Sequence, residues 1–334
     1  TPFPDPPVNL FNSAGIPVSP FTTDPNFLEG AQKQDVVVRR IWDESPHNAF
    51  TDLIRWNGKF YCAFRTGTGH VPGASGEDGK IQVIVSQDGE EWVSIAHLEE
   101  GGIDLRDPKL SVTPDGRLML LMGGSNYDGN TLIDRGSRVV FLDHDAESFS
   151  PITRVQLDPA IATGDDWLWR VTWHDGTGYG VVYQAQKSPW GLHLVKTADG
   201  VNFQLVKSLD LPGRPNESTI RFEDDGTMRI VVRNEEGGIG HFGSAKPPYE
   251  EFLWQTIPVR LGGPDMIQLA DGRWVMGTRK YTNPTKTVIG FLKDDGQFEE
   301  LEEFPSAGDT SYPRLLLHGD NLLVSYYASH EGKT

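Results

Sequence analysis

The chain has 334 residues, of which 23% are charged and 37% hydrophobic, a balance that excludes a disordered protein. Its net charge of −17 argues against a nucleic-acid partner, because phosphate binding needs an exposed basic surface. No apolar run is long enough to span a membrane, and the one cysteine, Cys62, rules out an internal disulfide.

Residues 1–34 are expected to form an N-terminal extension. They contain no signal-peptide core but read like the start of a mature exported chain, so we expect a secreted or periplasmic protein. The next segment, Asp35 to Trp42, is a candidate strand that could supply an outer strand to the last sheet and close a ring.

One hairpin pattern then recurs along the chain: an apolar strand, a turn with Asn or Asp next to Gly, and a second apolar strand. Its turn glycines are Gly58, Gly116, Gly176, Gly226, Gly272 and Gly319. Asn-Gly and Asp-Gly between alternating apolar residues are strong hairpin signals. Six copies predict an all-β, six-bladed β-propeller of four-stranded antiparallel blades, formed as one domain by residues 35–334. The chain ends soon after the second strand of the sixth copy, so we expect the third strand of that blade to be missing or truncated.

A second motif lies between these hairpins. The segment from Ser86 to Trp92, SQDGEEW, is an Asp-box, and the segment from Thr197 to Phe203 is a close variant of it. The aspartate can accept hydrogen bonds from backbone N–H groups of the turn while the aromatic residue packs between strands. We therefore expect this motif to be structural rather than catalytic.

Candidate site residues come from the two innermost strands of each blade, which face the axis of a propeller. Counting seven residues past each turn glycine gives three arginines, Arg65, Arg233 and Arg279. The strands before the turns add His47, Asn48, Asp107, Arg170, Glu217, Asp265 and Tyr312. Arginine matches a carboxylate bidentately, so clustered arginines favour an anionic ligand. The alternative is that each arginine pairs with a nearby acid as part of the scaffold.

Tyr312 and Glu217 suggest a specific chemistry. A tyrosine beside a glutamate can act as a nucleophile, because the carboxylate takes the phenolic proton. A neutral nucleophile suits a substrate that carries a carboxylate on the carbon under attack. A tyrosine near the axis can equally serve as a hydrogen-bonding wall residue.

From about Gln34 onward the chain resembles the bacterial sialidases (neuraminidases) and their propeller relatives. The resemblance rests on the Asp-boxes and on the ordered set Glu217, Arg233, Arg279, Tyr312 and Glu331. It implies that Tyr312 is the nucleophile, Glu217 its base, and Arg233 with Arg279 the clamp for the substrate carboxylate. It further implies that Glu331 orients a neighbouring arginine and that Arg65 matches an additional first-blade arginine of the family.

The chain departs from the family pattern at two places. His47 and Asn48 stand where the family has a first-blade arginine, so we expect either that Arg65 compensates or that the sugar differs from ordinary sialic acid. The acid/base aspartate of the family lies in a loop that here offers His70, Glu77 and Asp78. We favour Asp78, while Asp107 is an acid near the axis that would contact substrate.

The sequence thus predicts a retaining exo-glycoside hydrolase that releases a terminal acidic sugar, a sialic acid or a related 2-keto-3-deoxy sugar, from an anionic glycan. His47, Asn48, His70 and Arg170 are further candidates for substrate binding. Two alternatives remain open: a polysaccharide lyase acting on uronic acids, and a propeller that binds anionic glycans without cleaving them. No clustered metal ligands and no phosphate-binding loop are found, so no cofactor and no metal are expected.

Overall fold

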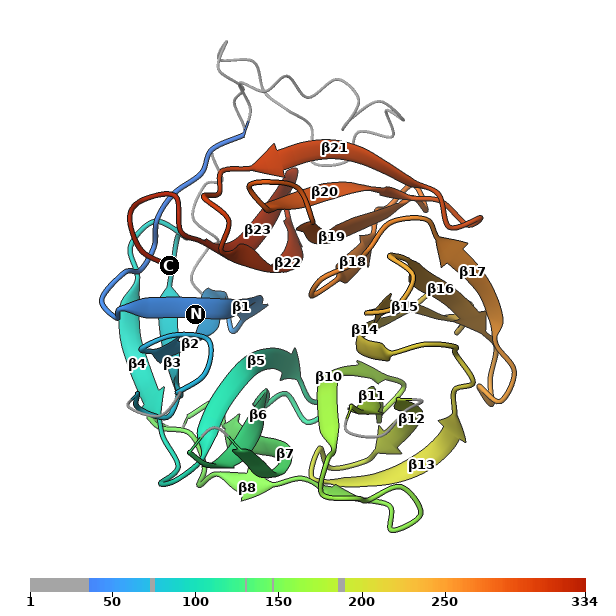
Figure 1. Cartoon of the computed structure of the whole chain (residues 1–334), viewed down its shortest axis with the longest axis horizontal. Coiled ribbons are helices and arrows are strands. Elements are labelled where there is room, and N and C mark those ends of the chain that lie inside the picture. Colours follow the sequence, from blue (N-terminus) through green and yellow to red (C-terminus); the bar gives the residue numbers. More distant parts are fainter. Residues whose placement is uncertain (1–35, 73–75, 130, 146, 186–189) are drawn as a thin grey trace.

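The computed structural model describes residues 36–72, 76–129, 131–145, 147–185 and 190–334, and the regular elements of these residues are all β-strands. Six sheets surround a central axis, and the inner strand of each contacts that of the next, with β22 against β1 closing the ring (Figure 1). The predicted all-β propeller of small antiparallel sheets is confirmed. Among these residues there is no helix with the length and apolar character needed to cross a bilayer.

The strands follow one another outward from the axis in each sheet. The first sheet contains β1 (His47–Trp56), β2 (Lys59–Gly67), β3 (Lys80–Ser86) and β4 (Val93–Leu98). The second contains β5 (Asp104–Val112), β6 (Leu118–Asp128), β7 (Thr131–Leu142) and β8 (Thr153–Arg154). The third contains β10 (Trp167–His174), β11 (Thr177–Gln184), β12 (Gly191–Thr197) and β13 (Asn202–Ser208), with β9 (Gln156–Leu157) parallel to β13 at its edge.

The remaining sheets are formed by the C-terminal part of the chain. The fourth contains β14 (Pro215–Phe222), β15 (Met228–Asn234), β16 (Gly240–Ala245) and β17 (Leu253–Ile257). The fifth contains β18 (Asp265–Gln268), β19 (Trp274–Lys280), β20 (Lys286–Leu292) and β21 (Phe298–Phe304). The sixth contains β22 (Thr310–His318) and β23 (Asn321–Ala328).

Two expectations about the closure of the ring are corrected. Within the described residues the sixth sheet has two strands rather than four. Residues 36–42 form no strand, so the expected outer strand from Asp35 to Trp42 is wrong where it can be tested. The valines of this segment stay on the surface, with Val37 70% exposed, whereas Ile41 and Trp42 pack against the core of the first sheet. Arg39 and Arg40 form ion pairs with Glu90 and Asp43.

The hairpin turns explain why the glycine spacing was informative. All six turn glycines have a positive φ, a conformation that glycine adopts without steric cost. At the tightest turns the preceding residue is left-handed as well, with φ values of 49° for Asn57 and 76° for Gly58. Asn and Gly tolerate this pair of conformations, which matches the twist of the flanking strands.

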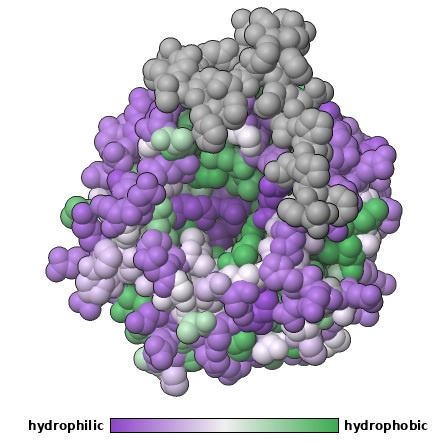
Figure 2. Space-filling model, turned by 180° about the vertical axis from the view of Figure 1, so that it is seen from behind, coloured by the Kyte–Doolittle hydropathy of each residue, from purple (hydrophilic) through white to green (hydrophobic). Residues whose placement is uncertain are grey.

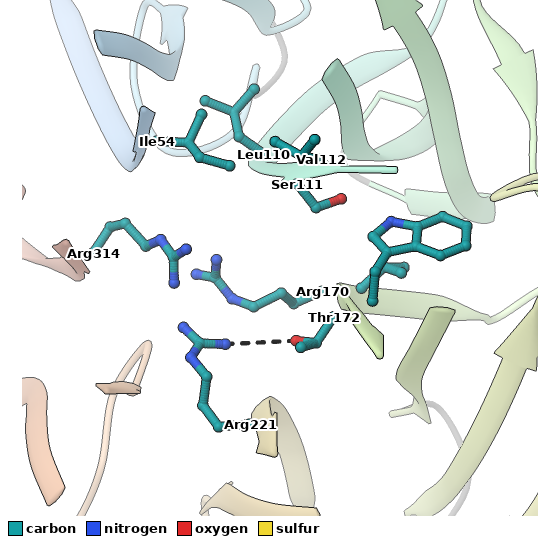
Figure 3. A pocket seen from close by; sticks show the side chains of 10 residues that line it. Ile54, Leu110, Ser111, Val112, Arg170, Thr172, Arg221 and Arg314 are labelled. Carbon is teal, nitrogen blue, oxygen red and sulfur yellow. Dashed lines mark hydrogen bonds between the residues drawn. The ribbon is translucent and has the colours of Figure 1, made fainter. Parts of the chain in front are cut away.

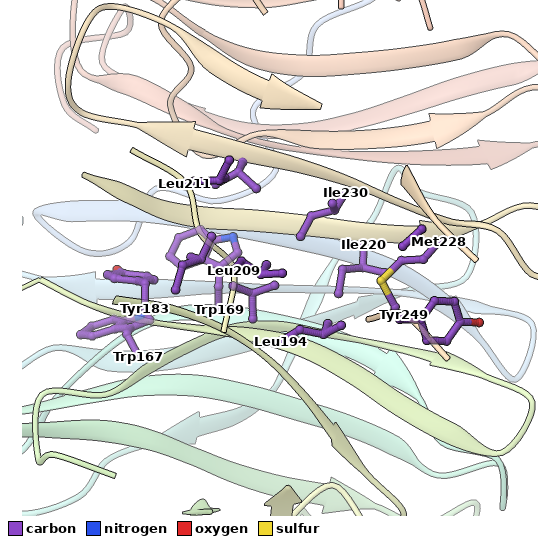
Figure 4. Close-up of a cluster of buried hydrophobic side chains, with 14 residues drawn as sticks. Trp167, Trp169, Tyr183, Leu194, Leu209, Leu211, Ile220, Met228, Ile230 and Tyr249 are labelled. Carbon is purple, nitrogen blue, oxygen red and sulfur yellow. The ribbon is translucent and has the colours of Figure 1, made fainter. Parts of the chain in front are cut away.

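The hydrophobic core lies between neighbouring sheets rather than on the axis. Between the third and fourth sheets, Trp169 and Leu194 pack with Ile220, Met228 and Ile230 (Figure 4). Each of these side chains is at most 2% exposed. Burial of one such side chain stabilises the fold by roughly 1.5–3 kcal/mol, so the interfaces hold the sheets together and leave the axis free for polar groups.

The inner strands are also joined by polar contacts between side chains and backbone. Oδ2 of Asp52 in β1 accepts a hydrogen bond of 2.6 Å from the N–H of Leu110 in β5. Asp265 in β18 does the same for the N–H of Leu315 in β22, at 2.9 Å. The Thr219 hydroxyl in β14 donates to the carbonyl oxygen just before β18, at 2.8 Å. These contacts fix the spacing of the strands that line the axis.

The turn that follows β3 has the structural role expected of it. Oδ1 of Asp88 accepts hydrogen bonds from the N–H groups of Glu90 and Glu91, at 2.8 and 3.1 Å, and the Ser86 hydroxyl accepts one from Gly89 N–H. In the turn after β12, Oδ1 of Asp199 accepts from Val201 and Asn202 N–H in the same way. These carboxylates serve the outer turns, away from the axis.

A repeated irregularity places side chains on the axis. Five of the six inner strands (β1, β5, β10, β14 and β22) carry a register shift near the N-terminal end, where two residues oppose one on the neighbouring strand. The first of the two residues is left-handed in three of them: Phe50 (φ 63°), Asp107 (φ 51°) and Tyr312 (φ 55°). A left-handed non-glycine residue costs about 1–2 kcal/mol, which the surrounding packing must offset.

Candidate active site

The bulges bring Tyr312 and Glu217 together. Tyr312 is the left-handed bulge residue of β22, and Glu217 lies in the bulge of β14, two sheets away around the ring. The phenolic O–H of Tyr312 donates a hydrogen bond of 2.6 Å to Oε1 of Glu217. The phenol and the carboxylate can therefore exchange a proton without a change of structure.

Glu217 is held as a carboxylate. Its other oxygen, Oε2, accepts hydrogen bonds of 2.7 Å from Nη1 of Arg233 and from the N–H of Gly263. Burial alone would raise the pKa of Glu217, but Arg233 and the hydrogen bonds from Tyr312 and Gly263 outweigh it and lower the pKa. Gly263 is left-handed, and a side chain there would overlap the Tyr312 ring, so the position requires glycine.

Tyr312 stays protonated in this environment. Burial raises the pKa of the phenol well above its usual value, and the charge of Glu217 raises it further. Aromatic rings surround it, with centroids 5.0 Å away for Phe50, 5.5 Å for Trp169 and 6.1 Å for Tyr327. The half-buried phenol is thus positioned rigidly, and it can attack only if Glu217 takes its proton.

Asp107 is the second carboxyl group of interest at the axis. Burial, together with the nearby charge of Glu217, raises its pKa to about 6 against the opposing effects of Lys109 and Arg106. Its Oδ1 atom is buried and has no hydrogen-bond partner among the described residues. A carboxyl group that is protonated in mild acid and has a free oxygen is suited to general acid/base catalysis.

Two cations border the pair without a carboxylate partner among the described residues. Nε of Arg279 donates to the Thr310 carbonyl oxygen at 3.0 Å, and its Nη2 donates to the Tyr327 hydroxyl at 3.1 Å. The Arg279 guanidinium lies 5.8 Å from the centre of the Tyr312 ring, and Nζ of Lys109 lies 5.7 Å from it. Burial, together with repulsion from Arg170, lowers the pKa of Lys109 to about 8 against the attraction of Asp52.

A cluster of His47, His70 and Asp309 lies beside these residues. Nε2 of His47 and Nε2 of His70 face the two oxygens of Asp309 at 3.1 and 2.9 Å. The His70 ring is 5.3 Å from the Phe50 ring, which contacts Tyr312. The three ligating atoms lie within 4.8 Å of one another and could hold a metal ion. The hydrogen bonds to Asp309 already account for the arrangement.

Other predicted residues lie outside the pair's surroundings. Arg65 is fully buried and pairs with Asp104 at 2.5 Å, so it cannot replace the missing first-blade arginine. Burial raises the pKa of Asp78, and Asp104 and Arg65, rather than Glu217, are the charged groups that influence it. Asn48 donates to the carbonyl oxygen of Thr334 at 3.0 Å and thereby helps to close the ring.

Two further predicted residues lie away from Tyr312 and Glu217. Glu331 lies on the surface and pairs with Arg40 at 3.1 Å, so it orients no arginine of the site. Arg170 pairs with Asp52 at 3.0 Å and lines a separate cavity further along the axis. Glu77 forms none of the described contacts with Tyr312 or Glu217.

The expected alignment of the three arginines is also corrected. Arg65 pairs with Ala49, one residue before the bulge of β1, and the Arg279 N–H bonds the Gly262 carbonyl at the matching place in the fifth sheet. Arg233 instead lies opposite the bulge of β14 itself. Arg233 and Arg279 both lie close enough to Tyr312 to lower the pKa of its phenol, although burial and Glu217 outweigh them.

Sequence reasoning missed Lys109, Trp169 as a wall of the site, and Asp309. Lys109 follows Asp107 by two residues and could have been found by the same argument that singled out Asp107. Asp309 directly precedes β22, so neither counting from the turn glycines nor the search of the inner strands reaches it. Figure 2 shows that one face of the ring is hollowed at its centre, with a hydrophilic floor beside hydrophobic side chains.

Comparisons with known proteins bear on the fold. No protein-family model and no curated sequence matches the chain. Among solved structures, a Dyadobacter fermentans protein of unknown function aligns with a TM-score of 0.73 at 18% identity, over 86% of this chain and 92% of that one. The NanB sialidase of Streptococcus pneumoniae aligns with a TM-score of 0.64 at 10% identity, over 83% of this chain and 65% of that one. An α-L-arabinanase of Penicillium chrysogenum aligns with a TM-score of 0.60 at 14% identity, over 86% and 95%.

This chain therefore spans less than two thirds of the NanB sialidase chain. At these identities the likeness shows the fold alone. The two aligned glycoside hydrolases are named a sialidase and an arabinanase, so they act on different sugars. The chain is a propeller with the fold of known glycoside hydrolases, including sialidases.

Proposed function

We propose that the protein is a retaining exo-glycoside hydrolase that releases a terminal acidic ketose, a sialic acid or a related 2-keto-3-deoxy sugar. The observation that carries the proposal is the 2.6 Å hydrogen bond from Tyr312 to Glu217, on the axis of a glycosidase-like propeller. A phenol nucleophile is useful where the anomeric carbon bears a carboxylate, which would repel the Asp or Glu nucleophile of most retaining glycosidases.

The first step forms a covalent intermediate. The Tyr312 oxygen attacks the anomeric carbon, the phenolic proton passes to Glu217, and the glycosidic C–O bond breaks. We assign the proton that the leaving oxygen receives to Asp107, in place of the loop residue Asp78, because Asp107 is buried at the axis with a pKa of about 6. Arg279 and Lys109 are the cations that can bind the substrate carboxylate, since neither has a carboxylate partner among the described residues.

The second step returns the enzyme to its starting state. Asp107, now a carboxylate, takes a proton from water, and the water oxygen attacks the anomeric carbon. The bond from that carbon to the Tyr312 oxygen breaks, and Glu217 returns its proton to the phenol. Two displacements at one carbon give net retention of configuration.

The test measures turnover of aryl glycosides of sialic acid, deaminated sialic acid, 2-keto-3-deoxyoctonate and common uronic acids. We expect release from an acidic ketose by the wild type and its loss in Tyr312→Phe. Tyr249→Phe is the matched control, because it removes a buried tyrosine hydroxyl that bonds the Gly226 carbonyl outside the site. A fluorinated ketose that traps the intermediate should label Tyr312, as seen by mass spectrometry of peptides.

Other outcomes would overturn the proposal. Equal turnover by Tyr312→Phe would exclude the phenol as nucleophile. A new ultraviolet absorbance on digestion of uronic-acid glycans would indicate elimination by a lyase. Binding of anionic glycans with no turnover of any substrate would indicate a binding module.

A further inference from the structure

Three arginines converge in a cavity on the propeller axis, apart from Tyr312 and Glu217. The cavity has a volume of about 230 Å³ and is lined by residues of five inner strands (Figure 3). Arg170, Arg221 and Arg314 point their guanidinium groups toward one another there. Along each strand the cavity residues follow the site residues, as Arg221 follows Glu217 and Arg314 follows Tyr312. The cavity therefore lies further along the axis.

The carboxylates in contact with these arginines do not balance their charge. Asp52 pairs with Arg170 at 3.0 Å, and Asp265 pairs with Arg221 at 2.6 Å and Arg314 at 3.2 Å. Three positive charges thus face two negative ones. Asp52 and Asp265 also accept backbone N–H groups of the neighbouring sheets, which uses part of their hydrogen-bonding capacity.

The arginines also retain unused capacity. Arg170 is 5% exposed, and its Nε–H is buried without a hydrogen-bond partner among the described residues. Burial lowers the pKa of Arg221 to about 9, and repulsion from Arg314 and Arg170 acts in the same direction against Asp265. A further negative charge beside these guanidinium groups would oppose this repulsion.

We propose that this cavity binds a small inorganic oxyanion, such as phosphate or sulfate. The volume is several times the roughly 30 Å³ that a water molecule occupies in the liquid, so a tetrahedral oxyanion fits together with water. Guanidinium forks bind oxyanions bidentately, and the anion supplies the missing negative charge. Because Arg170, Arg221 and Arg314 come from the third, fourth and sixth sheets, the bound anion connects three blades.

The first test is a titration of phosphate against the full chain at constant pH and ionic strength, with a bulky organic anion as the other counter-ion. Binding to the folded state alone stabilises it by mass action, so we expect a saturable rise of a few degrees in Tm and a matching heat of binding. Titrations with chloride, which is spherical, and acetate, which is planar, show whether a tetrahedral oxyanion is required. We expect the variant Arg221→Gln to weaken phosphate binding by about tenfold or more.

Two controls locate the anion. Arg229 is the strand partner of Arg221 but lies outside the cavity, where it pairs with Glu223 and Asp294. The variant Arg229→Gln should therefore bind phosphate like the wild type. Arg279→Gln alters the proposed substrate clamp and should also leave phosphate binding intact. Loss of binding in Arg279→Gln but not in Arg221→Gln would overturn the proposal by placing the anion at the clamp.

A crystallographic measurement keeps the proposal falsifiable if Arg221→Gln does not fold. Wild-type crystals soaked in selenate should show an anomalous peak among Arg170, Arg221 and Arg314. A cavity with no selenate peak, together with no saturable effect of phosphate on Tm, would show that water alone fills it and would overturn the proposal. Neither result depends on glycoside hydrolysis, so the site can be judged whether or not the proposed function holds.

Discussion

The phenolic oxygen of Tyr312 and the carboxylate of Glu217 lie 2.6 Å apart, although 95 residues separate them in the chain. Neither residue is placed by a regular strand, since each lies in a bulge of its inner strand. The pair is held from the other side by Arg233, which also forms an ion pair with Glu235. This arrangement makes separate predictions for the base, the acid, the clamp and the scaffold.

The base is tested by Glu217→Gln. The amide cannot take the phenolic proton, so we expect kcat for the acidic ketoside to fall by about 10²–10⁴-fold. Glu235→Gln is the matched control, because Glu235 also pairs with Arg233 but makes no contact with Tyr312 among the described residues. Equal losses in the two variants would mean that the position of Arg233 matters rather than a base at residue 217.

The acid is tested by the pH dependence of Asp107→Asn. With a pKa of about 6, Asp107 is protonated in mild acid, so the rate of the first step should fall as the pH rises through about 6. This limb of the pH–rate profile, the fall in rate above about pH 6, should vanish in Asp107→Asn and persist in Asp78→Asn. If Asp78→Asn abolishes the limb and Asp107→Asn does not, the loop carboxyl group is the acid.

The same residue predicts a change in stability. The folded pKa of Asp107 is raised above its unfolded value of 3.8. Its contribution is therefore fully present below about pH 4 and is lost as the pH rises through about 6. At pH 8 we expect Asp107→Asn to be more stable than the wild type by at most about 3 kcal/mol, with the gap closing near pH 4, as measured by urea denaturation. A gap that is unchanged across this range would contradict the raised pKa.

The clamp is tested by Arg279→Gln. Loss of a charge-assisted contact with the substrate carboxylate should raise KM for the acidic ketoside by about tenfold or more, with a smaller effect on kcat. Arg260→Gln is the control, since Arg260 is exposed and lies over the Tyr281 ring. A fall in kcat at constant KM would instead assign Arg279 to the orientation of Tyr312 or Tyr327.

The scaffold is tested by Asp265→Asn. Arg314 and Arg221 hold the pKa of this buried carboxyl group well below its usual value, against the effect of burial. Its stabilising contribution is present above pH 3.8, the unfolded pKa, and is lost as the pH falls. At pH 7 we expect Asp265→Asn to lose about 3–5 kcal/mol, because two mostly buried arginines, with side chains 16% and 14% exposed, lose their partner. Asp271→Asn, in a surface turn, should lose far less; equal losses would show that the buried ion pairs contribute little.

The sequence determined the repeated hairpins and the residues from which a site could be built. Asn-Gly and Asp-Gly turns are local signals, because the left-handed conformation of residues such as Gly58 and Gly176 depends on the residue itself. The ordered set of Glu217, Arg233 and Tyr312 could be named from the repeat and the resemblance, and the structure places these three in contact.

Tertiary structure alone decided which of the remaining candidates face the axis. The bulges at Asp107 and Tyr312 and the offset between Arg65 and Arg233 depend on how inner strands pack against neighbouring sheets. A shift of one residue turns a side chain to the other face of a strand, and neither turn length nor bulge position is encoded in the repeat spacing. The charge of each buried group then depends on partners far away in the chain, as the pairing of Arg170 with Asp52 shows.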